Sequence, residues 1–288
     1  MKNLVTFASA ILLAFSTTAC SQFRHTEHTG SFGGKTVKAS KNYVTKDIKV
    51  DNFTEINLKG SPDVTYTQKA GKPKVEIYTS DNIVDLLDIK VVDGTLNIGF
   101  KKGVNVSYNK LEVRVSSETL NQIGVAGSGD FALVNGLKTD RLKIAVAGSG
   151  DINADNIVCT NNLEVAIAGS GDIESNNLTC NGLKASIAGS GDMKLKNITA
   201  NNAEASIAGS GKVILSGTTQ EANYRISGSG DLSAADFQAK RISASISGSG
   251  SIQCYATDFL KARTSGSGSI GYKGNPEIDF PKKGLHKL

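Results

Sequence analysis

The sequence Ile-Ala-Val-Ala-Gly-Ser-Gly-Asp-Ile occupies residues 144–152, and Val-Ala-Ile-Ala-Gly-Ser-Gly-Asp-Ile occupies residues 165–173. The tripeptide Gly-Ser-Gly that they share occurs eight times, at residues 127–129, 148–150, 169–171, 189–191, 209–211, 228–230, 248–250 and 266–268. Successive copies are 21, 21, 20, 20, 19, 20 and 18 residues apart. A period of about 20 residues that persists over so many copies predicts a repeat architecture.

Apolar side chains recur at fixed positions around each tripeptide. Two residues before the first Gly lie Val125, Val146, Ile167, Ile187, Ile207, Ile226, Ile246 and Thr264. Most residues four and six positions before it are also apolar, and the residues between are small or polar. This alternation predicts a strand with one buried face. A second inward column follows the tripeptide, at Phe131, Ile152, Ile173, Met193, Val213, Leu232, Ile252 and Ile270, and a third includes Leu137, Ile157, Leu178, Ile198 and Phe237.

The repeat shows no helical periodicity and no hairpin signal between its strands. Asn156, Asn177 and Asn197 share one column, and we interpret them as a corner, because Asn tolerates left-handed backbone and can hydrogen-bond along a stack. The sequence therefore predicts an all-β fold, a right-handed parallel β-helix or solenoid with coils of about 20 residues. A repeated β-barrel is the alternative, but it needs turns that reverse the strand.

Residues 47–120 carry strand patterns without the repeat, and we expect them to cap one end of the solenoid. The predicted strands are 48–50, 55–59, 64–68, 74–78, 89–92, 95–100 and 111–115. Asp93-Gly94 is typical of a hairpin turn. Asp81 is a candidate N-cap for a short helix that ends at Leu87. Gly60-Ser61-Pro62-Asp63-Val64 resembles a degenerate copy of the repeated corner.

The N-terminal residues have the pattern of an export signal. Lys2 precedes an apolar run from Leu4 to Phe15, so residues 1–19 are predicted to be a signal peptide. Cys20 follows Ala19 at the expected cleavage point and is the candidate for lipidation. Residues 20–46 are predicted to form a flexible tether, and residues 277–288 a short C-terminal tail. These features predict an exported protein of the cell envelope, an outer-membrane lipoprotein whose acyl chains bind the membrane.

Several of these motifs together resemble the head GIN domain found in auto-transporter adhesins, a family typical of Bacteroidetes-type envelopes. The matching residues run from Phe53-Thr-Glu-Ile-Asn-Leu58 and Gly60-Ser-Pro-Asp63, through Val92-Asp-Gly-Thr-Leu96 and the Gly-Ser-Gly copies, to Gly268-Ser-Ile-Gly-Tyr272. The resemblance covers residues 47–276. It implies a β-helical surface domain, and it brings no catalytic mechanism.

A full auto-transporter also carries a C-terminal membrane barrel. This sequence ends in a short basic stretch, so we expect the lipid anchor to replace the barrel. The predicted function is that of a non-catalytic envelope lipoprotein, an adhesin-like or structural module that binds an unknown surface glycan or protein. The alternative is a polysaccharide-active β-helix enzyme.

The candidate chemistry of the repeat is limited. Asp130, Asp151, Asp172 and Asp192 each follow a corner and are weak candidates for Ca²⁺, although solvated turn residues explain them better. The column is uniform, whereas catalysis needs groups in different environments. His25, His28 and His286 lie outside the predicted repeat. The net charge of +5 is spread along the chain without a basic stripe, so no nucleic-acid partner, catalytic residue or cofactor is predicted.

Two further columns have open interpretations. Small residues flank the corners at Ala126, Ala147, Ala168, Ala188, Ala208, Ser227, Ser247 and Ser265, and they form either a flat docking strip or a tight bend. Cys159 and Cys180 occupy equivalent positions of successive repeats, so they can be stacked free thiols, which we favour, or a disulfide. Cys254 is predicted to be an inward core residue.

Overall fold

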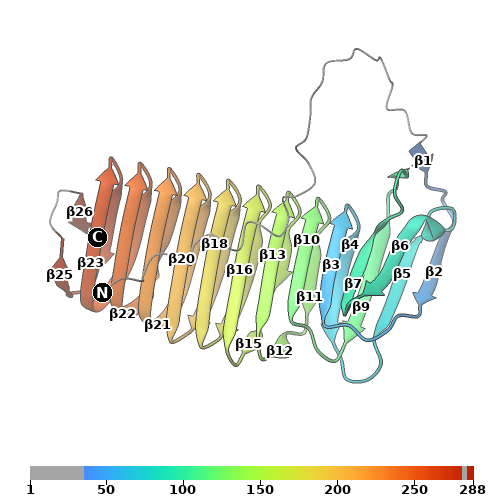
Figure 1. The fold of residues 1–288 in the computed structure, drawn as a ribbon, viewed down its shortest axis with the longest axis horizontal. Helices are drawn as coiled ribbons and strands as arrows, with labels where there is room; N and C mark the ends of the chain where they lie inside the picture. The colour runs from blue at the N-terminus through green and yellow to red at the C-terminus, as the bar shows by residue number, and fades with distance from the viewer. Residues whose placement is uncertain (1–35, 281–283) are drawn as a thin grey trace, which may run out of the picture. The chain divides into compact units, whose positions relative to one another are not determined.

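The computed structural model of the chain describes residues 36–280 and 284–288. Residues 121–276 form the predicted parallel β-solenoid (Figure 1). Each strand of one coil pairs in parallel with the equivalent strand of the next, and the pairing keeps the repeat register, so that Val146 pairs with Ile167 and Gly148 with Gly169. The stack contains β10 (Gln122–Gly127), β11 (Phe131–Val134), β12 (Leu137–Thr139), β13 (Leu142–Gly148), β14 (Ile152–Ala154), β15 (Ile157–Cys159), β16 (Asn162–Gly169), β17 (Ile173–Thr179), β18 (Gly182–Gly189), β19 (Asp192–Thr199), β20 (Asn202–Gly209), β21 (Lys212–Gly228), β22 (Asp231–Gly248), β23 (Ser251–Gly266) and β24 (Ser269–Lys273).

The three predicted apolar columns fill the interior of the stack. Their central members, such as Ile167, Ile173 and Leu178, are at most 2% exposed. Because each coil contributes one member per column, no coil buries its apolar surface alone, and stability comes from contact between neighbours. The structure thus confirms the column assignment made from the period-two alternation.

Successive coils approach each other closely at the Gly-Ser-Gly corners. The first Gly of every copy has a left-handed φ between +113° and +142°, which favours glycine. Its carbonyl oxygen accepts a hydrogen bond from the Ser N–H of the next coil, as in Ser170 N to Gly148 O at 2.9 Å. The second Gly is required for space, since a Cβ on Gly171 would lie 2.1 Å from the carbonyl oxygen of Gly150.

The Asn corner is also confirmed. Asn156, Asn177 and Asn197 have φ values of +58°, +59° and +53°. The Nδ2 of Asn177 donates to the Oδ1 of Asn156 at 2.9 Å, and the Nδ2 of Asn197 donates to the Oδ1 of Asn177 at 3.1 Å. Each Asn therefore supplies both the backbone conformation of the corner and one step of a side-chain ladder.

The N-terminal region forms a cap that is woven into the first coil. It contains β1 (Thr36–Lys38), β2 (Tyr43–Ile48), β3 (Glu55–Gly60), β4 (Asp63–Gln68), β5 (Lys74–Ser80), a 3₁₀ turn (Val84–Leu86), β6 (Leu87–Val92), β7 (Thr95–Phe100), β8 (Asn105–Ser107) and β9 (Leu111–Ser117). Gly60 pairs with Gly127 in register, which confirms that 60–64 is a degenerate corner. The β6–β7 hairpin turns at Asp93 and Gly94 as predicted, with φ values of +49° and +76°.

Three expectations at the edges of the fold are corrected. Strand β1 and most of β2 lie inside residues 20–46, which we predicted to be a tether, and β2 pairs with β5. The C-terminal tail contains β25 (Glu277–Asp279), which pairs with β23, and β26 (Leu285–Lys287), which pairs with β24. Asp81 does not cap a helix. Its carboxylate accepts a hydrogen bond from Ser40 Oγ at 2.5 Å, and the 3₁₀ turn begins after Ile83.

Candidate functional site

The column of aspartates after the corners holds successive coils together. The Oδ1 of Asp130 accepts the backbone N–H of Asp151 at 3.0 Å, and the same contact joins Asp151 to Asp172 and Asp172 to Asp192, both at 2.8 Å. The residues that we interpreted as solvated turn aspartates therefore also bind an amide of the next coil. Among the described residues, no group of three or more His, Cys, Asp or Glu side chains is arranged to hold a metal ion.

The small-residue strip lies on the outer face of the sheet formed by β10, β13, β16, β18 and β20. Ala168 and Ala208 on this strip are exposed, and Ala126, Ala147 and Ala188 are half-buried. A second small column runs beside it, through Gly124, Ala145, Ala166, Ser186 and Ser206. Two adjacent columns of small side chains leave this part of the outer face flat.

The same face is hollowed beside the two small-residue columns, at residues that precede them on each strand. Here the outward side chains of β16, β18, β20, β21, β22 and β23 line a groove of about 640 Å³. The outward residues of this groove are Asn162, Glu164, Gly182, Lys184, Asn202, Glu204, Glu221, Asn223, Arg241, Ser243, Phe259 and Lys261. The inward residues between them, among them Leu163 and Ala203, are at most 5% exposed, so the floor of the groove is a filled part of the solenoid.

Polar and aromatic groups occupy defined places in the groove. At one end, the Oε1 atom of Glu164 is buried, and no hydrogen-bond donor reaches it from the part of the chain that the structure describes. At the other end, the Arg241 guanidinium lies 5.4 Å from the centroid of the Phe259 ring. Arg241 Nε also lies 3.8 Å from Glu221 Oε1. The groove therefore offers an unpaired acceptor at one end and a cation over an aromatic ring at the other.

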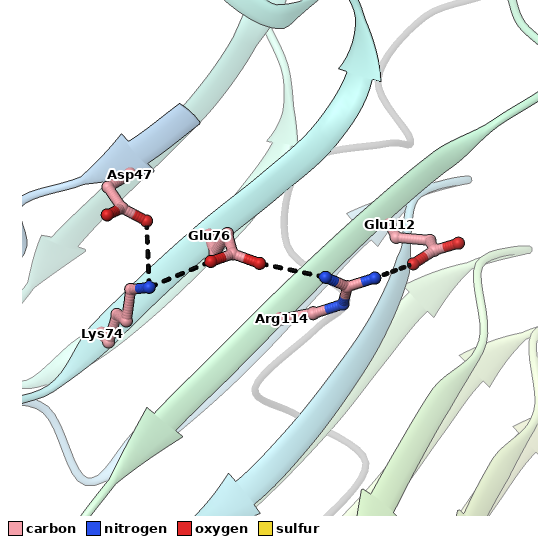
Figure 2. Close-up of polar contacts among 5 residues, drawn as sticks. All are labelled: Asp47, Lys74, Glu76, Glu112 and Arg114. Atoms are coloured by element: carbon pink, nitrogen blue, oxygen red, sulfur yellow. Dashed lines mark hydrogen bonds and ion pairs between the residues drawn. The ribbon is translucent and has the colours of Figure 1, made fainter. Parts of the chain in front are cut away.

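A second polar cluster lies on the cap, where charged side chains cross β2, β5 and β9 (Figure 2). Lys74 Nζ contacts Glu76 Oε2 at 2.9 Å and Asp47 Oδ1 at 3.3 Å. Arg114 connects Glu76 to Glu112, since its Nη1 lies 3.0 Å from Glu76 Oε1 and its Nη2 lies 2.7 Å from Glu112 Oε2. The hydrogen bond from Lys74, followed by that from Arg114, lowers the pKa of Glu76 below its usual value. This cluster is exposed and fully paired, so it joins cap strands and leaves no group free for a ligand.

The three cysteines of the described region are buried free thiols. Val158 pairs with Thr179, which places Cys159 beside Cys180 in the next coil, as the repeat spacing predicts. Burial raises the pKa of Cys180 to about 12, and it raises the pKa of Cys254 to about 12 as well. Cys254 is 0% exposed, which confirms its inward position. The structure therefore agrees with the stacked thiols that we favoured over a disulfide.

Cys20, the predicted lipidation site, lies outside the described residues. The groove was not predicted from the sequence, although one signal for it was present. The column Asn162, Gly182, Asn202, Glu221, Arg241, Phe259 is polar or aromatic except at Gly182. Gly182 is the member of this column without a side chain, and the Asn162 amide lies against it.

Comparison with known proteins gives one family and several similar structures. The family model described as "Putative auto-transporter adhesin, head GIN domain" matches residues 52–214 and 163–276. Among curated proteins, none matches the chain. Three of the similar solved structures come from Parabacteroides. A putative lipid binding protein from P. distasonis is 30% identical with a TM-score of 0.66, and the match covers 88% of this chain and 100% of that chain.

Two further relatives are described as putative adhesins. The protein from P. merdae is 29% identical with a TM-score of 0.64, and the match covers 88% of this chain and 95% of that chain. The protein from P. distasonis is 27% identical with a TM-score of 0.63, and the match covers 88% and 96%. These matches confirm the family resemblance seen in the sequence motifs. No helix in the described part of the chain has the length and apolar character needed to cross a membrane.

Proposed function

We propose that this chain, which belongs to the head GIN domain family of auto-transporter adhesins, is a lipid-anchored adhesin. It displays its solenoid at the cell surface and binds a partner through the outer face of the sheet. The observation that carries the proposal is the groove on that face, which crosses six strands of a stack whose interior is already filled. A filled interior leaves the outer surface for recognition.

The anchor belongs to the same proposal. The signal-like residues 1–19 and Cys20 support export and acylation, and residues between Cys20 and β1 would separate the fold from the membrane. One structural relative is described as a lipid binding protein, which makes lipid a second class of partner to test. In this chain the inward columns are tightly buried, so a lipid would have to bind outside the solenoid.

An adhesin role fits the carboxylates of the stack better than the polysaccharide-active enzyme considered above. Glycosidic cleavage needs two carboxyl groups in different environments, one protonated and one ionised. Asp130, Asp151 and Asp172 instead make the same backbone contact in successive coils. The family and the two relatives described as adhesins point the same way.

Cell fractionation and adherence test the proposal together. Bacteria that express the wild-type chain are expected to retain it in the membrane fraction, with a mature N-terminus at acylated Cys20. They should also adhere to at least one surface of a panel coated with glycoproteins, matrix proteins or phospholipid. Cells with Cys20→Ser should release the protein and lose adherence. Retention of the Cys20→Ser protein, or equal adherence of cells that lack the gene, would contradict the proposal.

A further inference from the structure

We infer that the groove over β16, β18, β20, β21, β22 and β23 is a binding site for a neutral oligosaccharide that lies along the stack, across the strands. The inference rests on the proposed adhesin function and deepens it, because it names the class of partner and the residues that bind it. It is argued from the charge of the groove, the state of its backbone, an unpaired carboxylate oxygen, and an aromatic side chain at one end.

The charges of the groove cancel. Its lining contains three acidic residues, Glu164, Glu204 and Glu221, and three basic residues, Lys184, Arg241 and Lys261, so the sum is zero. A groove that selects a polyanion or a basic peptide carries an excess of the opposite sign, which steers the charged ligand. The balance here favours a ligand without net charge.

The backbone of the groove is not available to a ligand. The groove lies over the middle of a parallel sheet, where β18 pairs with β16 on one side and β20 on the other, and β21 pairs with β20 and β22. A peptide that binds by strand addition needs a free sheet edge, which this face does not present. Recognition must therefore use side chains. Asn162, Asn202 and Asn223 each offer two donors and an acceptor, which suits hydroxyl groups that both donate and accept.

An unsatisfied oxygen and a missing side chain lie next to each other in the groove. Glu164 Oε1 is buried and has no donor among the described residues, a state that disfavours the free protein relative to one in which a donor is bound. The neighbouring Gly182, which pairs with Asn162, does not have a left-handed φ, so its backbone does not require glycine. A Cβ there would lie 2.7 Å from Asn162 Oδ1, so the missing side chain gives the Asn162 amide room to lie against Gly182 on the wall of the groove. A sugar hydroxyl in the groove can donate to this oxygen when the Glu164 carboxylate turns toward the ligand, and the Asn162 amide beside Gly182 can bind the same sugar.

The far end of the groove offers a surface for the apolar face of a sugar ring. Phe259 is the aromatic residue of the lining, it is half-buried, and Arg241 lies over its ring. An aromatic face packs against C–H groups, and the flanking guanidinium and Glu221 carboxylate can bind the hydroxyls at the ring edge. Six strands make five steps of about 4.8 Å each, so the groove extends about 24 Å, enough for several sugar rings.

Titration calorimetry of the purified full-length chain tests the site with defined hexasaccharides. The neutral probes are maltohexaose, cellohexaose, mannohexaose and xylohexaose, and the anionic probes are hexasaccharides of hyaluronan and heparin. At least one neutral probe is expected to bind, with an affinity that changes less than twofold between 50 and 500 mM NaCl, because it carries no charge.

Variants then place the binding in the groove. Gly182→Leu displaces the Asn162 amide and places an apolar side chain in the groove, and Arg241→Ala and Phe259→Ala remove the far end. Each should weaken binding at least tenfold. Lys194→Ala is the matched control, because Lys194 lies on β19, contacts Glu174 and is outside the groove. If Gly182→Leu does not fold, the other two variants decide the result. Binding of anionic probes alone, binding of no probe, or unchanged binding in Arg241→Ala and Phe259→Ala would overturn the inference.

The two proposals fail in different ways. If cells with Arg241→Ala and Phe259→Ala adhere as wild type while cells without the gene do not, the adhesin function stands and the groove is not its site. If cells without the gene adhere normally, the adhesin function fails, whichever hexasaccharide binds.

Discussion

The repeat stack and the N-terminal cap are both built from β-strands, but these strands pair in different ways in the two regions. In the stack every coil pairs in parallel with the next, and the same three apolar columns pass through all of them. In the cap, β5 pairs antiparallel with β2 and β9, and β6 pairs antiparallel with β7. Each parallel coil pairs with the previous coil along one edge and leaves an equivalent edge free on its other side, so another coil can be added. The antiparallel strands of the cap do not leave such an edge, and the stack ends there.

The cap is also joined to the stack by an unusual order of strands. β3 pairs with β7 on one side and with β10 on the other, and β4 pairs with β9 and β11. The chain therefore forms one coil with β3 and β4, leaves it to build the outer layer, and returns on its opposite side (Figure 1). The repeated coils therefore form the apolar interior of the solenoid, whereas pairing between strands that are distant in the sequence forms its N-terminal end.

The largest expected loss of stability comes from a charge placed in the interior of the stack, compared with a charge placed at a half-buried position of the cap. Ile187→Asp places a charge in the middle of the stack, where the side chain is 2% exposed, and should lower the free energy of unfolding by at least about 4 kcal/mol. Ile89→Asp, at a half-buried position of cap strand β6, should cost about 1 kcal/mol. Urea denaturation measures both. A loss for Ile187→Asp no greater than that for the outward control Lys184→Asp would show that the column is misassigned.

A glycine pair separates close approach from backbone strain. Gly171→Ala puts a Cβ 2.1 Å from the Gly150 carbonyl oxygen and should destabilise the chain by about 3 kcal/mol. Gly103→Ala in the cap meets open space, and its φ of +75° costs about 1–2 kcal/mol. Thermal unfolding of the two variants should therefore rank them clearly. Equal midpoints would mean that the coils are not in close backbone contact at the corner.

The Asn ladder allows the two roles of one side chain to be separated. Asn177→Ala removes the ladder contacts and strains the corner, so a loss of about 2 kcal/mol is expected. Asn177→Gly removes only the ladder and should cost about 1 kcal/mol. Denaturant midpoints of both variants give the comparison. If the Gly variant is the less stable one, the left-handed conformation is not what the corner demands.

The smallest expected effect belongs to the exposed ion network of the cap. Because the pKa of Glu76 is lower in the folded chain than in the unfolded chain, its contribution is present above the unfolded pKa and is lost as pH falls through the folded pKa. Glu76→Gln should therefore lower the unfolding midpoint slightly at pH 7 and not at all once Glu76 of the wild type is protonated. A difference that stays constant into acid would exclude the network as its cause.

The sequence predicted the stack well because each structural requirement is repeated. Ile167 and Ile187 are equivalent, so their shared pattern identifies an inward column, and the Asn corner is visible for the same reason. The second Gly of the corner has the sequence context of a turn residue, whereas Gly171 must be small because the Gly150 carbonyl, 21 residues earlier in the chain, lies against it. That contact becomes evident only when coils are placed on one another.

The cap and the groove were harder to predict, because neither repeats. Tyr43-Val-Thr-Lys-Asp-Ile48 is too polar to indicate a strand, and its pairing with β5 depends on residues 74–80. Asp81 has the sequence context of an N-cap, but Ser40 and Asn42 bind it from the edge of the sheet. The groove depends on outward side chains from six coils, which do not repeat from coil to coil, and its trace in the sequence is a mostly polar column that Gly182 interrupts.

Removal of one whole coil tests the central claim, that the stack is a series of equivalent coils ended by a separate cap. Deletion of residues 171–190 joins Ser170 to Gly191 and restores the Gly-Ser-Gly-Asp corner with one 20-residue repeat fewer. Small-angle X-ray scattering of this variant, compared with wild type, should show a folded particle that is shorter by about 4.8 Å. An unfolded chain, or a folded chain of unchanged maximum dimension, would contradict the account.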